Sequence, residues 1–226
     1  MKNGGFVRRF AQRGVNTSLD EDVIMSIRSF NSMLNTDAYQ RRLAIMNASL
    51  RAPIASDYAA IASWIPDSAA GLRWAGPRLS FPFAASDLSA LLAVPGGGEF
   101  SYSLIDESGS PCGFGQHWVL QPGAVHLGRI IVAPDARGRG LGRVLCQQLV
   151  SAGLHATSAT AVTLRAYRDN LVAVGLYSSL GFVEVAAEST DDVLFMKMLA
   201  NRLFVTDTQQ QVAAARHLLR AGQRQR

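Results

Sequence analysis

The chain has 226 residues, of which 48% are hydrophobic and 17% are charged, and its formal net charge is +5. This composition excludes global disorder, because enough apolar side chains are present to build a core. No apolar run approaches the ~20 residues of a membrane-spanning helix. The two cysteines, Cys112 and Cys146, form neither a CxxC pair nor a zinc pattern. We therefore expect no membrane span, no disulfide framework and no metal site.

The charge divides the chain into three parts. Residues 1–45 carry a net charge of +3, residues 46–199 carry −2, and residues 200–226 carry +4. We expect an N-terminal extension that is helical or partly disordered, a globular domain over 46–199, and a C-terminal helical tail. Residues 1–25 lack the apolar stretch of a secretory signal, so the expected compartment is the cytoplasm.

The regular pattern begins near Ala48 and predicts a mixed α/β sheet. Ser56 or Asp57 can cap the first helix of this domain, and Gly181 is placed to end the last one. Strands are expected over 49–53, 100–106, 113–120, 125–132, 161–167, 182–187 and 193–199. Helices are expected over 56–64, 68–74, 86–94, 140–155 and 171–180. Residues 100–120 and 182–199 are typical of hairpins.

A glycine-rich helix start follows the strand over 125–132. Residues 129–143 read RIIVAPDARGRGLGR. Glycines allow a ligand to approach the backbone, and the free N–H groups of a first helical turn favour an anion such as a pyrophosphate. Arg139 and Arg143 can add positive charge. The GxGxxG pattern of a dinucleotide-binding fold and the Walker A lysine are both absent.

A second motif lies in residues 162–182, VTLRAYRDNLVAVGLYSSLGF. The two motifs together resemble the GNAT superfamily of N-acetyltransferases. Its (Gln/Arg)-x-x-Gly-x-(Gly/Ala) signature is matched by Arg137, Gly140 and Gly142, after the Val132 and Pro134 of the preceding strand end. Its Asn-x-x-Ala-x-x-x-Tyr-x-x-x-Gly-Phe signature is matched by Asn170, Ala173, Tyr177, Gly181 and Phe182. The resemblance covers about Met46 to Leu199.

This resemblance implies the GNAT fold, a mixed and mostly antiparallel central sheet flanked by helices. It also implies acetyl transfer from acetyl-CoA, as co-substrate and without a metal, to a primary amine by direct attack in a ternary complex. We expect a small-molecule acceptor, with a protein or peptide amine as the other option. No enzyme nucleophile is needed in this family, and Cys146 is expected to be a core residue.

The resemblance further implies how acetyl-CoA is bound. The residues expected to contact it are Ile130, Ile131 and Val132 along the strand, Arg137, Gly138, Arg139, Gly140, Leu141, Gly142 and Arg143 at the helix start, and Asn170, Ala173 and Tyr177 on the next helix. The Ile130 N–H would stabilise the oxyanion, and Tyr177 would protonate the departing thiolate. Two simpler interpretations remain: Asn170 as a plain helix cap and Tyr177 as a packed aromatic.

The general base is a separate question. Many family members place a carboxylate eleven residues before the signature Arg or Gln, and here that position is His126. A histidine has an ordinary pKa near 6.5, which suits a base at neutral pH. Strand alternation predicts His126, Gly128 and Ile130 on one face, with Arg129 as a structural residue on the other. A strand histidine bonded to its neighbours, with water as the base, is the alternative.

The acceptor is less defined by the sequence. Trp64, Trp74 and the aromatics of residues 81–83 could line its pocket or simply pack in the core. Asp67, Asp87 and Glu99 could attract a cationic acceptor or remain solvated.

Two other functions compete with the enzyme, and the oligomeric state is open. One competitor is a non-catalytic acetyl-CoA sensor that uses the same binding loop. The other is a nucleic-acid-associated factor acting through the basic ends. Nucleic-acid binding needs a basic patch on the folded surface, and the slightly acidic middle of the chain argues against it. The resemblance is also compatible with a homodimer.

Overall fold

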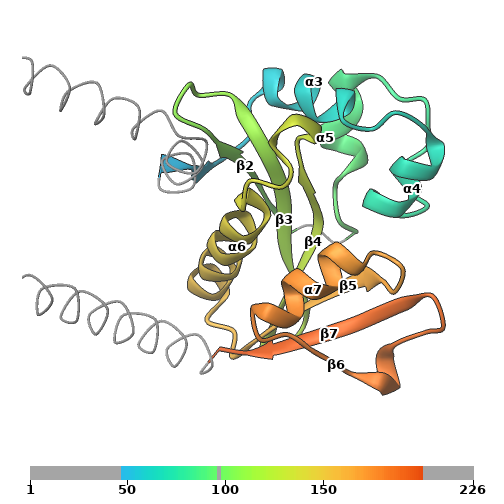
Figure 1. The fold of residues 1–226 in the computed structure, drawn as a ribbon, viewed down its shortest axis with the longest axis vertical. Helices are drawn as coiled ribbons and strands as arrows, with labels where there is room; N and C mark the ends of the chain where they lie inside the picture. Colours follow the sequence, from blue (N-terminus) through green and yellow to red (C-terminus); the bar gives the residue numbers. More distant parts are fainter. Residues whose placement is uncertain (1–46, 96–97, 201–226) are drawn as a thin grey trace, which may run out of the picture. The chain divides into compact units, whose positions relative to one another are not determined.

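The structure is a computed structural model that describes residues 47–95 and 98–200. The extension expected over 1–45, and the expected tail apart from Ala200, lie outside the described residues. Within them the order of elements agrees with the prediction: a strand, helices, a hairpin, then a strand–helix–strand–helix run and a final hairpin (Figure 1). The longest helix and the central strands are therefore correctly identified from the pattern alone.

The elements divide into strands and short or long helices. The strands are β1 (Ser49–Arg51), β2 (Phe100–Ile105), β3 (Pro111–Gln121), β4 (Ala124–Val132), β5 (Ala161–Tyr167), β6 (Val183–Glu184) and β7 (Val193–Leu199). The α-helices are α3 (Ala55–Ser63), α4 (Ser68–Ala75), α5 (Leu88–Leu91), α6 (Leu141–Thr157) and α7 (Leu171–Ser179). Three-residue 3₁₀ turns lie at Ala85–Asp87, Pro134–Ala136 and Ala186–Glu188.

The described strands form one seven-stranded sheet in the order β1-β2-β3-β4-β5-β7-β6. Every neighbouring pair is antiparallel except β4 and β5, which are parallel. The connection between these two parallel strands is the long helix α6, as a parallel pair requires a crossover. The predicted mixed, mostly antiparallel sheet is thus confirmed.

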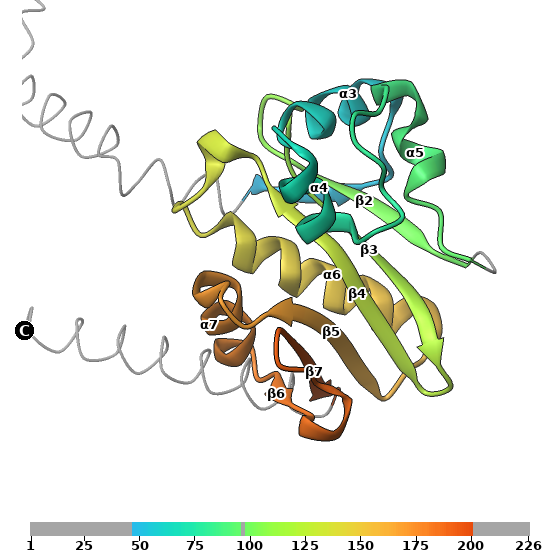
Figure 2. The same cartoon turned by 90° about the vertical axis from the view of Figure 1, so that its right-hand side faces the viewer.

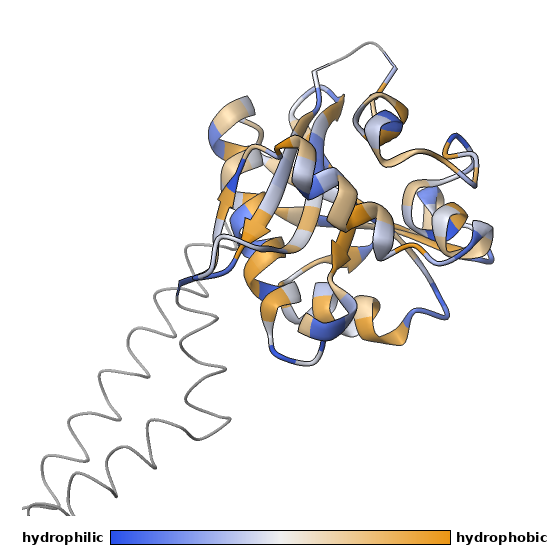
Figure 3. Cartoon of the chain, turned by 90° about the horizontal axis from the view of Figure 1, so that it is seen from above, coloured by the Kyte–Doolittle hydropathy of each residue, from blue (hydrophilic) through white to orange (hydrophobic). Residues whose placement is uncertain are grey.

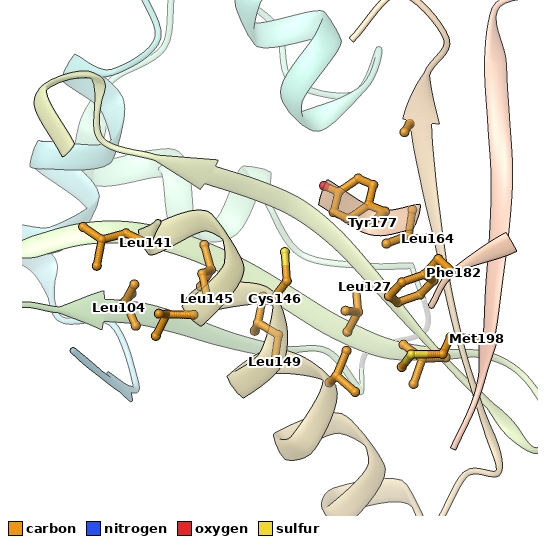
Figure 4. Packing of buried hydrophobic residues seen from close by; sticks show 14 of the residues in the cluster. Leu104, Leu127, Leu141, Leu145, Cys146, Leu149, Leu164, Tyr177, Phe182 and Met198 are labelled. Atoms are coloured by element: carbon orange, nitrogen blue, oxygen red, sulfur yellow. The ribbon is translucent and has the colours of Figure 1, made fainter. Parts of the chain in front are cut away.

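The main core lies between the sheet and α6, and α7 contributes to it. Leu145, Cys146 and Leu149 of α6 are fully buried there together with Leu127 and Leu164 of the central strands (Figure 4). The helix can lie this close because β3 presents glycines to it. A Cβ added to Gly115 would come within 2.4 Å of Leu149, far inside van der Waals contact.

A second core covers the opposite face of the sheet. Ile61 of α3, Leu88 of α5 and Phe114 of β3 are fully buried in it, with Trp74 of α4 packed against them. Figure 1 shows α3, α4 and α5 grouped together, apart from α6 and α7. In Figure 3 hydrophobic residues concentrate in the strands and helices and hydrophilic residues in the connecting loops. The sheet is therefore covered on both faces.

One predicted cap is wrong. Asp57 does not precede α3 but lies in its first turn, after the N-cap residue Ile54. Its buried carboxylate accepts hydrogen bonds from the Ile54 N–H, from Arg51 of β1 and from Ser103 of β2. Burial acts to raise the pKa of Asp57, but these bonds outweigh burial and hold the pKa below its ordinary value. Asp57 thus caps α3 from within its first turn, through the Ile54 N–H, and the same carboxylate forms an ion pair with Arg51.

Candidate functional site

The central strands β4 and β5 pair over only part of their length. Parallel register joins Ala124 to Ala161 and continues as far as Leu127 and Leu164. Beyond that point the strands diverge, as Figure 2 shows, although β4 continues to Val132. The opening therefore lies at the carboxyl ends of the two parallel strands, where open α/β sheets bind their ligands.

A β-bulge interrupts β4 at the same level. Gln116 of β3 pairs with Gly128 and Phe114 pairs with Ile131, so Gly115 lies opposite two residues of β4. Arg129, within the bulge, has a φ of +53°, in the left-handed region.

The bulge changes which face each side chain occupies. A Cβ on Gly128 would meet the Trp118 indole, and Trp118 also contacts His126. Ile130, in contrast, lies on the α6 face near Gly115. The expectation that His126, Gly128 and Ile130 share a face with Arg129 opposite is therefore wrong, because the extra residue reverses the alternation after Gly128.

The loop after β4 ends in an uncapped helix start. Gly138 and Gly140 have φ values of +73° and +86°, which non-glycine residues rarely adopt. Gly140 is the N-cap of the 17-residue helix α6, and it offers no side chain to bond the first-turn N–H groups. The Arg143 N–H donates to the Gly140 carbonyl at 3.0 Å, whereas the Leu141 and Gly142 N–H groups precede the first intrahelical bond and lie at the positive end of the helix dipole. The loop fits an anion such as the pyrophosphate of a coenzyme.

Three arginines surround this helix start. Arg137, Arg139 and Arg143 are all exposed. The Arg137 Nε–H donates to the Val132 carbonyl at 3.2 Å, and the Arg143 Nη2–H donates to Ser179 Oγ of α7 at 2.6 Å. None of the three forms an ion pair within residues 47–95 and 98–200. Their charge is thus not neutralised by a carboxylate of that part of the chain.

The helix α7 begins beside the opening. Asn170 is its N-cap, and its side-chain oxygen accepts from the Ala173 N–H at 3.2 Å. The capping role considered for Asn170 is therefore present. Contact with a coenzyme would use the amide's remaining hydrogen-bonding groups.

Tyr177 lies near the C-terminal end of α7. Its side chain is buried in the main core, between the sheet and α6. In Figure 4 its ring lies beside Leu164 and Phe182, and its hydroxyl points away from both. That hydroxyl makes no hydrogen bond with any described residue. Burial, and to a lesser extent the nearby Cys146, raises the pKa of Tyr177 well above its ordinary value. The phenol therefore stays protonated at neutral pH, which is the state a general acid requires.

Cys146 faces the same core and is fully buried. Burial raises the pKa of its thiol to about 12, opposed only weakly by Arg143. The thiolate, which is the nucleophilic form, is therefore absent at neutral pH. The geometry agrees with the interpretation of Cys146 as a core residue.

His126 is buried on the face opposite α6. Its Nδ1 lies 2.9 Å from Thr163 Oγ1 of β5, and its ring packs between Trp118 and Phe195. Burial, assisted by the positive charge of Arg165, lowers the pKa of His126 to about 4. The imidazole is neutral at pH 7 and is a weak base there.

This depressed pKa predicts a loss of stability in mild acid. The unfolded chain binds a proton on this histidine below pH 6.5, whereas the folded protein resists binding until about pH 4. The free energy of unfolding should therefore fall as the pH drops from 6.5 toward 4, by about 3 kcal/mol from His126. Urea unfolding at several pH values measures this slope, which His126→Asn should flatten.

The control for this measurement is His155→Gln, at an exposed histidine of α6, which should retain the wild-type slope. His117 is also buried, and burial lowers its pKa, so some loss remains in His126→Asn. An unchanged slope in His126→Asn would contradict the assignment.

Aromatic and polar residues converge on the His126 face beside the bulge. The Trp74 Nε1–H donates to the Arg129 carbonyl at 2.8 Å, and the Arg129 guanidinium lies 5.7 Å from the Trp118 ring centre. Trp64 packs against both cores, and Phe83 packs against the second one. Of the predicted pocket aromatics, only Trp74 therefore has a polar contact with the bulge.

The places of Gln116 and Trp118 beside Arg129 were not predicted, and Arg129 lies on the face opposite to the one expected. Only pairing with β3 brings these residues together. The unusual Gly128, in a strand otherwise rich in β-branched residues, was the available signal, since such a glycine often marks a bulge.

The acids considered for a cationic acceptor have other surroundings. Asp67 caps α4 by accepting from the Ala70 N–H at 2.8 Å, and Asp87 bonds Ser86. Glu99 is close enough to Arg129 to raise the pKa of that guanidinium. A cluster of free carboxylates is therefore not found on this face within the described residues.

The described residues contain neither a helix suited to cross a bilayer nor a cluster suited to hold a metal ion. Among the helices of residues 47–95 and 98–200, none combines the length and the apolar character that crossing a bilayer requires. In the same ranges no three His, Cys, Asp or Glu side chains are placed to hold a metal ion.

Comparison with known proteins gives one family and many similar folds. The sequence model of the acetyltransferase (GNAT) family matches residues 70–182, which is half of the chain. No curated protein matches the sequence.

Among solved structures, spermidine N-acetyltransferase from Vibrio cholerae, in complex with CoA and spermine, is similar with a TM-score of 0.58 and 19% identity, over 69% of this chain and 97% of that one. The aminoglycoside acetyltransferase AAC(6')-Ib with ribostamycin and coenzyme A is similar with a TM-score of 0.55 and 20% identity, over 69% and 94%. At these identities the likeness concerns the fold.

Proposed function

The chain belongs to the GNAT family of acetyl-CoA-dependent N-acetyltransferases, and from that premise we propose that it acetylates a primary amine of a small molecule. The amine attacks the thioester directly in a ternary complex. The observation that carries this proposal is the divergence of β4 and β5 directly beside the uncapped start of α6. That arrangement offers an anion site and an open strand edge at one place.

In this proposal acetyl-CoA supplies the activated acetyl group and the chain supplies the binding groups. The backbone N–H groups from Gly138 to Arg143, in the glycine loop and the first turn of α6, hold the pyrophosphate, and the three exposed arginines add charge. The pantetheine arm, which is peptide-like, pairs with the open edge of β4 through the backbones of Ile130, Ile131 and Val132. Asn170 and Ala173 contact it from α7. The absence of any residue within 4 Å of a Cβ at Gly138 supports close approach.

Two groups act on the reacting atoms. The Ile130 N–H, displaced by the bulge, donates to the thioester oxygen and stabilises the negative charge that develops there; one such donor is worth about 3 kcal/mol. The Tyr177 hydroxyl gives its proton to the departing thiolate. The lack of a hydrogen-bond partner for this hydroxyl among the described residues supports this role.

Deprotonation of the amine is assigned to water. A base works best when its pKa lies near the operating pH, and burial leaves His126 at about 4. Its Nδ1 is also engaged with Thr163. His126 then serves as a neutral wall of the acceptor site, where it can orient a water molecule.

The similar folds support a small-molecule acceptor. One is named for spermidine and was solved with spermine, and another was solved with ribostamycin. Spermine and ribostamycin are both small molecules with primary amines.

The test is turnover of acetyl-CoA by the full chain against an amine panel, followed by the release of free CoA thiol. The panel holds polyamines, aminoglycosides, amino acids and N-terminal peptides. We expect thiol release with at least one small-molecule class and a matching acetylated product by mass spectrometry. Acetyl-CoA binding without turnover on any amine would favour the sensor function instead.

A further inference from the structure

Arg129 occupies a strained position on the face of the sheet opposite α6, beside Gln116 and Trp118. It is the bulge residue of β4, and its φ of +53° is unusual for a side chain with a Cβ. Such conformations persist where the surrounding structure enforces them, and they cluster at functional sites. Here the Trp74 Nε1–H of α4 donates a hydrogen bond to the Arg129 carbonyl, and this bond fixes the orientation of the Arg129 backbone.

The guanidinium is held by one of its three nitrogens. Its Nη1 donates to the Leu92 carbonyl at the end of α5 and to Gln116 Oε1 at 2.5 Å. Its Nε and Nη2 donate to no group in the part of the chain that the structure describes. These two nitrogens form one edge of the guanidinium. The two N–H bonds on this edge are parallel and match the two oxygens of a carboxylate.

The charge of this half-buried guanidinium has no close counterion among the described residues. The ion pairs there are Arg51–Asp57, Arg73–Asp169 and Arg168–Glu184. Burial lowers the pKa of Arg129, Glu99 raises it from a distance beyond ion-pair contact, and Arg78 lowers it further. A charge that is partly removed from water is stabilised by an anion placed against it.

We propose that the Nε–Nη2 edge of Arg129 binds a carboxylate of the acceptor, so that the acceptor is an amino acid or a similar amine with a carboxylate a few bonds away. This inference rests on the proposed function. Arg129 directly precedes Ile130, whose N–H is assigned to the thioester oxygen, so a carboxylate bound here brings a nearby amine to the reacting carbon. The same positive charge disfavours a second ammonium group, which separates this acceptor class from polyamines.

The substrate side of the experiment uses matched acceptors. Each standard amino acid is assayed beside its α-carboxamide and beside the amine in which hydrogen replaces the carboxylate, with spermidine included. Initial rates of CoA thiol release give kcat/KM for each. We expect the best amino acid to exceed its own carboxamide by about 30-fold, the difference expected for a charge-assisted hydrogen-bonded pair.

The protein side uses Arg129→Met, Arg129→Lys and a control. The carboxylate-to-carboxamide ratio should fall toward one in Arg129→Met and take an intermediate value in Arg129→Lys, which keeps the charge but loses the edge. Arg168→Met removes the same charge from an exposed surface ion pair and should keep the ratio. The Lys variant and the wild-type substrate series decide the question even if the Met variant does not fold.

The outcomes separate the two proposals. Turnover of polyamines or carboxamides as fast as amino acids, or a ratio that survives in Arg129→Lys and Arg129→Met, overturns the inference and leaves the acetyltransferase function standing. Failure to release CoA with every amine overturns the proposed function, and the inference with it.

Discussion

Replacing Tyr177 with phenylalanine is expected to lower kcat by about 100-fold to 10,000-fold, the range that a positioned general acid contributes. The change removes only the hydroxyl, which has no hydrogen-bond partner among the described residues. The ring keeps its edge contact with Phe182, whose centre lies 6.1 Å away. Acetyl-CoA affinity should therefore change by less than about threefold, since a hydroxyl that acts only in the transition state contributes little to ground-state binding.

The measurement combines steady-state kinetics with acetyl-CoA titration and a thermal melt. Tyr58→Phe is the matched control, because Tyr58 is also packed in a core, beside Phe114, but on the opposite face of the sheet. It should keep the wild-type kcat. Wild-type kcat in Tyr177→Phe would show that Tyr177 is only a packed aromatic and would assign the proton transfer to water.

Replacing Gly138 with aspartate is expected to weaken acetyl-CoA binding by about 100-fold. The new carboxylate would lie close to the pyrophosphate held at the start of α6. Two like charges about 5 Å apart repel by about 3 kcal/mol at an effective dielectric constant of 20, which corresponds to about two orders of magnitude in Kd. Aspartate tolerates left-handed backbone better than most residues, so the variant should fold.

The control for this variant is Gly109→Asp, in the turn between β2 and β3. Gly109 has a φ of +80° against +73° for Gly138, and a Cβ at either position meets nothing within 4 Å. The two variants therefore share the backbone strain and the added charge, and they differ only in where the charge lies relative to the start of α6. Calorimetric titration with acetyl-CoA compares them; equal affinities would remove the anion site from the start of α6.

The local caps and turns that the two motifs predict are present in the structure. Asn170 caps the start of α7, and Gly181 follows the end of α7 with a positive φ. The glycine loop leads into the start of α6. Each of these features is local, because a cap or a turn is determined by a few adjacent residues. Local chemistry can be read from sequence without knowledge of the fold.

The face of the sheet around Arg129 was predicted poorly because it depends on contacts between strands. The bulge at Arg129 arises from how β4 pairs with β3, and the period-two pattern over 125–132 contains no sign of an extra residue except Gly128. The same reason explains the wrong cap at Asp57, whose carboxylate is claimed by Arg51 and Ser103 from two other strands. Contacts with neighbouring strands decide both cases.

The divergence of β4 and β5 leaves the centre of the sheet without its full set of ladder hydrogen bonds. If the pantetheine arm of acetyl-CoA pairs with the open edge of β4, as we propose, it completes that ladder, and acetyl-CoA has nothing comparable to bind in the unfolded chain. By mass action, a ligand at 100 times its Kd adds about 2.7 kcal/mol to the free energy of unfolding. The lifetime of this protein against proteases would then rise and fall with the supply of its own co-substrate.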